Sequence, residues 1–323
     1  MKAILFDQSG APDVLHMGDA PDPQPGADEL LVRVHATALN RADLLQRRGG
    51  YAPPPGASPI LGLELAGEVV QPAGEWQIGD RVMAVVTGGG YAELAAVPAG
   101  MAMRIPERFS YQEAAAIPEA FLTAYLNLFT LGRLQPGEVA LIHAGASGVG
   151  TAAIQLVRAA DARAIVTASA DEKLALCRDL GAELAINYTS EAFVEQVQAA
   201  TGGRGADVVL DFIGAPYWDS NLAALALGGR LMLIGFLGGS RGQLDLGMIM
   251  GKSLTVASTT LRRTALPQKV ALTRAFADFA LPRFERGELR PVIDRIMPIA
   301  QAAQAHRVLE TNSNAGKVVL SIS

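Results

Sequence analysis

The 323-residue chain lacks several features that mark particular classes of protein. It has one cysteine, Cys177, which rules out an internal disulfide and any multi-cysteine zinc site and fits a reducing compartment. The net charge of -5 provides no basic field for nucleic acid or for an anionic membrane surface. No apolar run approaches the length of a membrane span, and the first residues reach acid and glycine too early for a signal peptide. We therefore expect a cytoplasmic protein without nucleic-acid or membrane partners.

Metal-ligand and nucleophile motifs are also missing. The four histidines, His16, His35, His143 and His306, are scattered without the spacing of metal ligands. No G-x-S-x-G elbow and no Ser-His-Asp order stands out. We expect no metal site. Ser147 lies in a glycine-rich turn and is expected to contact a cofactor, and the nearby His143 is expected to pack or hydrogen-bond below it.

The first third of the chain has the sequence pattern of a β-barrel. Half of all residues are hydrophobic and 18% are charged, which suits a soluble globular enzyme, and the length is sufficient for two domains with cores. Up to about residue 104, short strand-like runs alternate with glycine and proline turns, a pattern typical of a compact all-β barrel. We expect strands at residues 29–36, 65–70, 81–86 and 91–97.

From about residue 119, strand and helix patterns alternate. Such alternation predicts a parallel sheet with helices on both faces. The expected strands are residues 139–142, 163–168, 183–187, 207–211, 230–235 and 253–257. The expected helices are residues 120–131, 152–157, 171–180, 192–200 and 221–226.

The C-terminal tail does not continue this series. A long helix is expected over residues 266–286, broken or bent before Pro282. A strand at residues 295–299, a helix at 300–309 and a last strand at 317–321 follow. We expect this tail to fold back onto the N-terminal barrel.

One stretch, residues 139–150, points to a ligand. An apolar strand enters the turn Gly145-x-x-Gly148-x-Gly150, and a helix follows. Such a turn directs free backbone N–H groups and the positive end of a helix dipole at one point, which suits a phosphate or pyrophosphate. Glycine lets the ligand approach the backbone closely. The sequence therefore predicts dinucleotide binding here.

The end of the next strand bears on which dinucleotide binds. An NAD-specific site carries an acid at this tip, whereas this chain has Ser169, followed by Lys173 one short turn later. Serine and lysine suit a 2′-phosphate, although Asp171 and Glu172 between them oppose it. The pattern favours NADPH. Further along, the strand that ends at Gly235, Phe236 and Leu237 is expected to line the nicotinamide side, with a simple glycine-rich turn as the alternative.

Two stretches of the barrel carry candidate substrate contacts. Asn40 precedes a short apolar helix, and Asp43 is placed to stabilise the first turn of that helix. Tyr51 lies in a glycine- and proline-rich loop. Its hydroxyl is able to donate a hydrogen bond to a carbonyl substrate, although such an aromatic is more often a lid or surface contact.

At these residues the chain resembles a known family over nearly its whole length. It is similar to the zinc-free quinone oxidoreductase, or zeta-crystallin-like, branch of the medium-chain dehydrogenase/reductase superfamily, and most of all to the p53-inducible quinone reductase subgroup. The matching stretches are residues 40–49, 53–56, 61–64, 79–82, 144–150, 187–188 and 316–320. Zinc-dependent relatives have a cysteine at the position of Asn40 and a histidine at that of Leu63, so a zinc alkoxide mechanism lacks its ligands here.

The resemblance implies a fold and a domain division. The fold class is α/β, with a GroES-like β-barrel domain from residues 1–120 and 265–323 and a Rossmann domain with a doubly wound parallel sheet, binding NADPH, from residues 121–264. The family usually dimerises through the edges of the Rossmann sheet, so a homodimer is expected.

The resemblance also implies a set of site residues. Asn40 and Tyr51 are the expected catalytic residues in the cleft between the domains. The remaining expected cofactor contacts are Thr123, Asn127, Gly145, Ser147, Gly148, Val149, Gly150, Ser169, Lys173, Tyr188, Gly235, Phe236, Leu237, Asn314 and Lys317, with Asn40 serving as a further one. The family often has Gly-Ser where this chain has Ser169-Ala170, which makes Lys173 and Tyr188 the firmer pair.

The function expected from these features is NADPH-dependent, zinc-independent transfer of a hydride, or of single electrons, to quinones. The first alternative is an enoyl or alkenal double-bond reductase that uses the same cofactor residues. The second is a nucleotide-binding structural or RNA-binding protein of the crystallin type, against which the acidic composition argues. Tyr51 is expected to orient the quinone or enone substrate.

Overall fold

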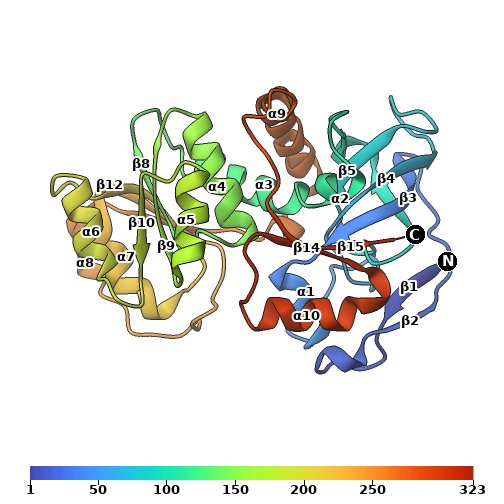
Figure 1. Ribbon diagram of the computed structural model, residues 1–323, viewed down its shortest axis with the longest axis horizontal. Helices are drawn as coiled ribbons and strands as arrows, with labels where there is room; N and C mark the ends of the chain where they lie inside the picture. The colour runs from blue at the N-terminus through green and yellow to red at the C-terminus, as the bar shows by residue number, and fades with distance from the viewer. Residues whose placement is uncertain (323) are drawn as a thin grey trace. The chain divides into compact units, whose positions relative to one another are not determined.

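The last strand of the chain pairs with a strand near its start and closes one structural unit. The computed structural model describes residues 1–322, and it divides into two units, Met1–Leu122 with Leu261–Ser323 (unit 1) and Thr123–Thr260 (unit 2). In unit 1, β15 (Lys317–Ser321) runs antiparallel to β3 (Glu29–Ala38), with Leu320 opposite Thr37. This pairing confirms that the tail returns to the N-terminal barrel (Figure 1).

The main sheet of unit 1 has seven strands in the order β14-β15-β3-β4-β5-β7, with β6 paired to β3. Its other strands are β4 (Glu64–Gln71), β5 (Arg81–Val85), β6 (Leu94–Pro98), β7 (Ala102–Arg104) and β14 (Ile293–Pro298). A separate hairpin joins β1 (Lys2–Leu5) and β2 (His16–Asp19). Gly67 on β4 allows the central strands to approach, because a Cβ there would lie 2.1 Å from the Arg33 carbonyl oxygen.

The helices of unit 1 are short except one. They are α1 (Arg41–Arg47), α2 (Tyr111–Ala115), α9 (Leu266–Glu285) and α10 (Ala302–Glu310), and α3 (Pro118–Tyr125) continues into unit 2. The expected break before Pro282 is wrong, because α9 is continuous through it, and a bend there stays a prediction. Pro282 lies in the last turn, where its missing N–H removes a single helical bond, and its carbonyl still accepts from the Arg286 N–H.

Unit 2 is built on six parallel strands in the order β10-β9-β8-β11-β12-β13. The strands are β8 (Val139–Ile142), β9 (Arg163–Ala168), β10 (Leu184–Asn187), β11 (Ala206–Asp211), β12 (Leu225–Leu233) and β13 (Thr255–Ser258). Numbered by their order along the chain, they follow the 3-2-1-4-5-6 sequence of a Rossmann sheet, with its switch point between β8 and β11. The predicted doubly wound parallel sheet is confirmed.

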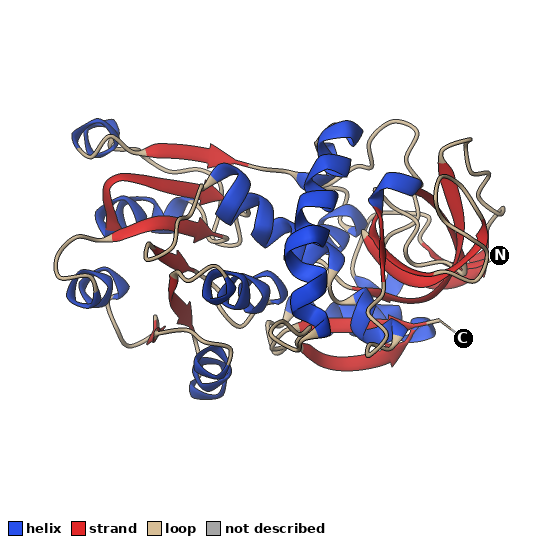
Figure 2. Ribbon diagram, turned by 90° about the horizontal axis from the view of Figure 1, so that it is seen from above, coloured by secondary structure: helices blue, strands red, loops and turns tan. Residues whose placement is uncertain are grey.

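Helices flank this sheet on both sides (Figure 2). They are α4 (Gly148–Ala159), α5 (Asp171–Asp179), α6 (Phe193–Ala200), α7 (Trp218–Ala224) and α8 (Leu246–Gly251). A buried cluster that includes Leu141, Ile165, Val209 and Leu222 forms the core on one face. The strands have few polar residues because helices cover them on both faces.

Several expected boundaries differ from the structure. β12 begins at Leu225, so the end of the helix expected at 221–226 is strand, and β6 begins at Leu94 instead of residue 91. Leu126–Leu131 forms a π-helical segment, a form common at functional sites. Five short elements were not predicted from the sequence: β1, β2, β7, α2 and α8.

The structure also corrects the expectation about long apolar runs. The helical stretch Tyr111–Leu131 has a mean hydropathy of 1.3 and is long enough to cross a membrane by length and composition alone. However, 67% of its 18-residue apolar window is buried inside the protein, which is typical of a core helix. It was missed because it is made of successive helical segments, not one uninterrupted apolar run.

The partly buried ammonium group of Lys252 stabilises the end of α7. Lys252 Nζ donates to the carbonyl oxygens of Leu222, Ala223 and Leu225 at 2.8–2.9 Å, and these carbonyls close the helix. A cation at a helix C-terminus opposes the helix dipole and satisfies acceptors that the helix leaves open. Lys252 therefore joins α7 to the segment before β13.

We predict that Lys252→Met lowers the free energy of unfolding by about 1–3 kcal/mol, because three charge-assisted hydrogen bonds are lost while the apolar stem is kept. Urea unfolding followed by circular dichroism measures the change. Arg241→Met, at an exposed position of the same unit, is the control and should stay within about 0.5 kcal/mol of wild type. Equal stabilities for Lys252→Met and the control would show that the three contacts contribute nothing.

Candidate functional site

The strand-to-helix turn after β8 has the geometry of an anion site. Ser147 caps α4: its hydroxyl accepts from the Gly150 N–H at 3.1 Å, and its carbonyl accepts from Thr151. The N–H groups of Gly148 and Val149 precede these bonds and have no acceptor within the helix. Two free N–H groups at the positive end of a 12-residue helix fit a pyrophosphate.

The glycines of this turn are required mainly by packing. A Cβ on Gly150 would lie 2.4 Å from the Ala144 carbonyl oxygen, and one on Gly145 would lie 2.8 Å from Val166 Cβ. Ala144 itself has a left-handed φ of 50°. Glycine at 145 and 150 therefore lets the turn lie against its own helix and against β9.

Residues expected near an adenosine phosphate lie at adjacent strand ends. β9 ends at Ala168 and pairs with Asn187 at the end of β10, so Ser169 and Tyr188 follow neighbouring strands. The Tyr188 N–H donates to the Ala168 carbonyl at 3.2 Å, and both Ser169 and the Tyr188 side chain are exposed. Lys173 lies in the first turn of α5, the helix that follows.

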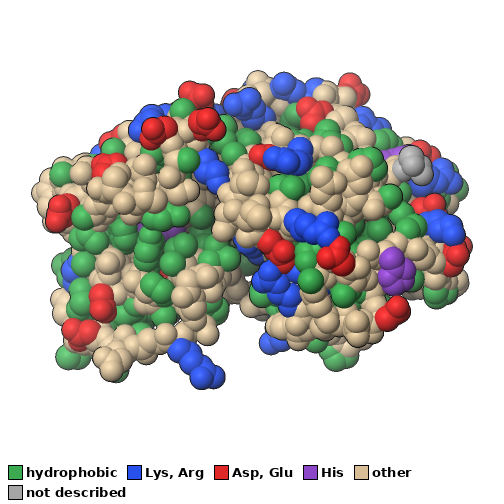
Figure 3. Space-filling view, turned by 60° about the horizontal axis from the view of Figure 1, so that its bottom comes forward, with side chains coloured by type: hydrophobic (Ala, Val, Ile, Leu, Met, Phe, Trp, Pro, Cys, Tyr) green, Lys and Arg blue, Asp and Glu red, His purple; other side chains and the backbone are tan. Residues whose placement is uncertain are grey.

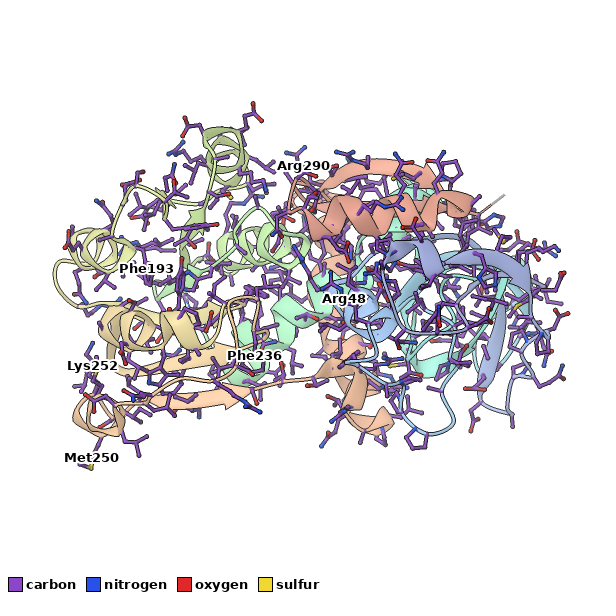
Figure 4. The ribbon with its side chains drawn as sticks, turned by 90° about the horizontal axis from the view of Figure 1, so that it is seen from below. Arg48, Phe193, Phe236, Met250, Lys252 and Arg290 are labelled. Carbon is purple, nitrogen blue, oxygen red and sulfur yellow. The ribbon has the colours of Figure 1, made fainter. Side chains whose placement is uncertain are left out.

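Three further expected site residues follow the carboxyl end of β12. Gly235 follows this strand and its N–H donates to the Asp211 carbonyl. Phe236, which is labelled in Figure 4, and Leu237 come next. Their side chains are 52% and 54% exposed. Large apolar side chains exposed at the carboxyl ends of parallel strands lie where doubly wound folds bind ligands.

His143 lies under the glycine turn and is part of the core. It is fully buried, with Nδ1 3.0 Å from Thr167 Oγ1 and Nε2 2.7 Å from Asn221 Oδ1, and its ring meets Phe193 and Tyr217 edge-on. Burial lowers its pKa to about 4, so the ring is neutral at pH 7. His143 thus packs and hydrogen-bonds in the core, and its expected position below a cofactor stays a prediction.

Thr123 and Asn127 are nine-tenths or more buried and contact one another. Asn127 Nδ2 donates to the Thr123 carbonyl at 2.8 Å, and Asn127 Oδ1 accepts from Thr259 at 3.1 Å. The Asn127 amide thus joins the π-helical segment to the residues after β13. Their predicted contact with a nicotinamide stays a prediction.

In unit 1, the buried carboxylate of Glu64 accepts hydrogen bonds from two of the expected site residues, Asn40 and Lys317. Glu64 Oε1 accepts from Lys317 Nζ at 2.6 Å and from Asn40 Nδ2 at 2.8 Å, and Glu64 Oε2 accepts from the Glu119 N–H at 2.8 Å. Lys317 Nζ also donates to Asn40 Oδ1 and to the Leu39 carbonyl, both at 2.7 Å. The ammonium group is therefore fully occupied within unit 1.

A second carboxylate, Asp43, lies beside this group and is fully buried. It accepts from the N–H groups of Asn40 at 2.7 Å and Gly62 at 3.2 Å. Burial raises its pKa to about 6, against the lowering effect of those two hydrogen bonds. Beyond it, Tyr91 Oη lies 3.2 Å from His306 Nε2 and 3.5 Å from Asp43 Oδ2.

Arg47 connects the hydrogen-bonded series Asp43, Tyr91 and His306 to the surface. This fully buried guanidinium contacts His306 Nδ1 at 3.1 Å and the carboxylate of Glu310, which Arg48 also binds at 2.5 Å. A surface cavity of about 380 Å³ adjoins these groups; its other lining residues are Ser9, Gly10, Ala11 and Pro12. An arginine is always protonated and so cannot accept a proton. This series of hydrogen bonds therefore orients His306 and Tyr91 and does not carry protons to the surface.

Tyr51 and Asn314 are placed by two further contacts. The Arg262 guanidinium carbon lies 5.1 Å from the centre of the Tyr51 ring, a stacked cation–π arrangement. Asn314 Nδ2 donates to the Gly316 carbonyl at 2.7 Å and so fixes the turn that leads into Lys317. The predicted role of Asn314 at a cofactor stays a prediction.

The donor set does not suit zinc. Among residues 1–322, no group of three or more His, Cys, Asp or Glu side chains is arranged to hold a metal ion. The position beside Glu64 is filled by the Lys317 ammonium, and Cys177 is buried in α5 of the other unit. Any cation brought to Glu64 would meet a like charge.

These features agree with comparisons to known proteins. Residues 26–107 match the family described as "Alcohol dehydrogenase GroES-like domain", and residues 148–275 match "Zinc-binding dehydrogenase". A GroES-like domain with a Rossmann unit defines the medium-chain dehydrogenase/reductase superfamily. A quinone oxidoreductase from Pseudomonas aeruginosa is 36% identical over 326 residues, 99% of each chain. The chain therefore belongs to the zinc-free quinone oxidoreductase branch of this superfamily.

Solved structures give the same result. An NAD-dependent alcohol dehydrogenase has a TM-score of 0.89 at 33% identity, with all of both chains covered. The Escherichia coli quinone oxidoreductase complexed with NADPH has a TM-score of 0.90 at 28% identity, again over all of both chains. The CurK enoyl reductase has a TM-score of 0.88 at 27% identity, covering 100% of this chain and 99% of its own. Membership of the p53-inducible subgroup stays a prediction.

Sequence reasoning did not assign a site role to three residues: Glu64, Glu119 and Arg262. Glu64 stood within a matching family stretch, Leu61-Gly62-Leu63-Glu64, and that was the only signal available for it. Glu119 and Arg262 lie in segments without motifs. Their environment depends on partners that the fold brings from distant positions, such as Glu64 for Glu119 and Thr87 for Arg262.

Glu119 gives a prediction about pH. Burial and the nearby charge of Glu64 raise its pKa to about 8, whereas an unfolded glutamate titrates near 4.3. Between these values the folded protein holds a proton that the unfolded chain has released, so stability falls as pH rises toward about 8. The raised pKa of Asp43 also makes stability fall as pH rises, but only up to about pH 6. The window from pH 6 to 8 therefore reports Glu119.

We predict that Glu119→Gln removes this fall and is more stable than wild type at pH 9 by on the order of 2 kcal/mol, with little difference at pH 5. Urea unfolding at several pH values measures it. Glu285→Gln, at an exposed position, is the control and should follow the wild-type profile. Parallel profiles for wild type and Glu119→Gln would contradict the prediction.

Proposed function

We propose that this protein is an NADPH-dependent quinone oxidoreductase that transfers a hydride without a metal. One observation supports it above the others: the open N-terminus of α4 lies at the switch point of the Rossmann sheet, in a chain similar over its full length to quinone oxidoreductases. Its reaction would use quinones or related conjugated carbonyl compounds, which accept hydride without a Lewis acid.

The proposed site combines residues that the family resemblance implies with the local geometry described above. The N–H groups of Gly148 and Val149, with Ser147, hold the pyrophosphate, and Ser169, Lys173 and Tyr188 surround the 2′-phosphate. The residues proposed to line the nicotinamide and substrate are Asn40, Tyr51, Thr123, Asn127, Gly235, Phe236, Leu237, Asn314 and Lys317. Lys317 and Asn40 act through the hydrogen-bonded group around Glu64, because their polar atoms bind one another.

When bound, the reduced nicotinamide supplies the hydride. The residues of this chain contribute position and a fixed electrostatic setting, which are sufficient to account for most of the rate when the acceptor is already electrophilic. Tyr51 orients the acceptor. A quinol oxygen takes its proton from solvent, so the proposed reaction does not require a dedicated acid.

There are two alternative candidates for the function. The similarity to the CurK enoyl reductase favours an enoyl or alkenal double-bond reductase as the second candidate. That reaction needs a proton delivered to carbon as well as a hydride. The third candidate binds the nucleotide without turnover, as a structural protein.

The test is a pair of titrations with NADPH and NADH followed by an acceptor panel. A quinone reductase oxidises NADPH with 1,2-naphthoquinone faster than with 2-alkenals. The reverse order would favour the double-bond reductase. NADPH binding with no turnover on any acceptor would favour the structural protein, and binding of neither coenzyme would overturn all three.

The preference for NADPH rests on Lys173. We predict that Lys173→Met weakens NADPH binding about tenfold, because one charge-assisted contact to the 2′-phosphate is lost, and leaves NADH binding unchanged. Glu172→Gln is the matched variant: it removes a repelling charge and should tighten NADPH binding. Fluorescence titration of both coenzymes measures each constant. An equal effect of Lys173→Met on NADPH and NADH would show that Lys173 does not contact the phosphate.

We also propose a homodimer formed through unit 2. β13 is a free edge of the six-stranded sheet, and nearby apolar side chains are exposed: Leu246 by 67% and Met250 by 82%. Met250 points away from the body of the unit (Figure 4), and further apolar side chains gather on the face of unit 2 seen in Figure 3. Pairing of two β13 edges would satisfy their backbone groups and cover this surface. A monomer mass in light scattering would contradict it.

A further inference from the structure

Arg262 is a buried cation with one unused group of donors. It is 5% exposed and lies in the short 3₁₀ turn Leu261–Arg263. Its Nε donates to the Thr87 carbonyl at 2.8 Å and Nη1 reaches the Tyr51 carbonyl at 3.4 Å. Nη2 is buried and has no hydrogen-bond partner among residues 1–322. Almost all buried donors in proteins are paired, so Nη2 is a candidate donor to a bound molecule.

The surroundings fix the direction of that donor. The guanidinium group stacks on the Tyr51 ring, and the Nε contact to Thr87 prevents it from turning away. It forms no ion pair within 4 Å in the described part of the chain, although Glu119 is one of the charges that act on it. Arg262 is thus a charged group held rigidly next to the residue expected to orient the substrate, with its charge not neutralised by direct contact.

We propose that Arg262 Nη2 donates a hydrogen bond to the carbonyl oxygen of the acceptor and holds the oxyanion that develops there. This inference rests on the proposed function. The hydride adds its electron pair to the conjugated acceptor, the displaced π pair moves to a carbonyl oxygen, and one solvent proton completes the product. The nicotinamide is oxidised by two electrons and the acceptor is reduced by two.

The geometry explains why arginine is used and not lysine. Nε and Nη1 are anchored to the backbone, so the planar fork presents Nη2 at a fixed position and pays no rearrangement as charge builds on the oxygen. A lysine would supply charge without that orientation. Tyr51 contributes its ring face to the stack, and its hydroxyl is not needed for this role.

The experiment compares Arg262→Met, Arg262→Lys and the control Arg263→Met, an exposed neighbour in the same turn. For reduction of 1,2-naphthoquinone, Arg262→Met should lower kcat/KM about 10²–10³-fold, mostly in kcat, because the contact is strongest in the transition state. Arg262→Lys should recover part of the loss. NADPH affinity should stay within about twofold of wild type in all variants, and Arg263→Met should match wild type.

Two further variants separate orientation from folding. Tyr51→Phe keeps the ring and should lower kcat/KM only mildly, whereas Tyr51→Leu removes the stack and should behave like Arg262→Lys. Methylguanidine added to Arg262→Ala should restore part of kcat, which a purely structural role would not allow. A loss below threefold in Arg262→Met, or no rescue by methylguanidine, would overturn the proposal and leave a structural arginine whose Nη2 binds water. A loss of several orders of magnitude in Tyr51→Phe would also overturn it, since the hydroxyl would then be an essential acid.

A binding measurement keeps this result separate from the failure of the proposed function. A substituted nitrophenol in the presence of NADP⁺ should bind to wild type as the phenolate below its solution pKa, and the absorbance shift should be absent in Arg262→Met. If wild type shows this shift but reduces no quinone, the proposed function fails and the oxyanion site stands. If wild type reduces quinones and the phenolate shift is the same in Arg262→Met, the oxyanion site fails alone.

Discussion

The contact between Lys317 and Glu64 determines how unit 1 is held together. One partner begins the last strand of the chain and the other begins β4, and both are almost completely buried. Removing one partner of such a pair costs about 3–5 kcal/mol, because an unpaired charge is left inside. Here the cost of burying both ions is offset by additional acceptors: Lys317 also binds Asn40 and the Leu39 carbonyl. The pair therefore fixes the register in which the C-terminal tail joins the barrel.

This contact also sets the electrostatics around it. Glu64, Asp43 and Glu119 are three acids close enough to influence one another, whereas only Lys317 pairs directly with one of them. The cluster therefore has more acids than cations, and the excess shows as raised pKa values for Asp43 and Glu119. A proton held on Glu119 at neutral pH lowers the negative charge beside Tyr51 and Arg262. Such a setting leaves the positive charge of Arg262 available to an incoming oxygen.

The sequence predicted best those features that depend on neighbours along the chain. The alternation of strands and helices after residue 119 led to the correct sheet class, and the glycine spacing at 145–150 predicted the strand-to-helix turn at which α4 begins. Anion binding at that turn stays a prediction. The continuation of α9 through Pro282 was missed because a proline in a final turn costs one hydrogen bond, and a sequence pattern does not show where the helix ends. Glu119 and Arg262 were missed for a different reason. Their chemistry comes from burial and from partners such as Glu64 and Thr87, which lie far away in sequence.

The position of Asn40 shows how the structure changes the interpretation of a matching residue. The resemblance made Asn40 a catalytic candidate, but its amide donates to Glu64 and to the Ala38 carbonyl and accepts from Lys317. Both amide protons and the amide oxygen thus have partners inside unit 1. A group whose donors are all engaged positions its neighbours and has no donor left for a developing charge. Of the polar side chains near Tyr51, Arg262 keeps an unpaired N–H group, so the stabilisation of an oxyanion falls to it and not to Asn40.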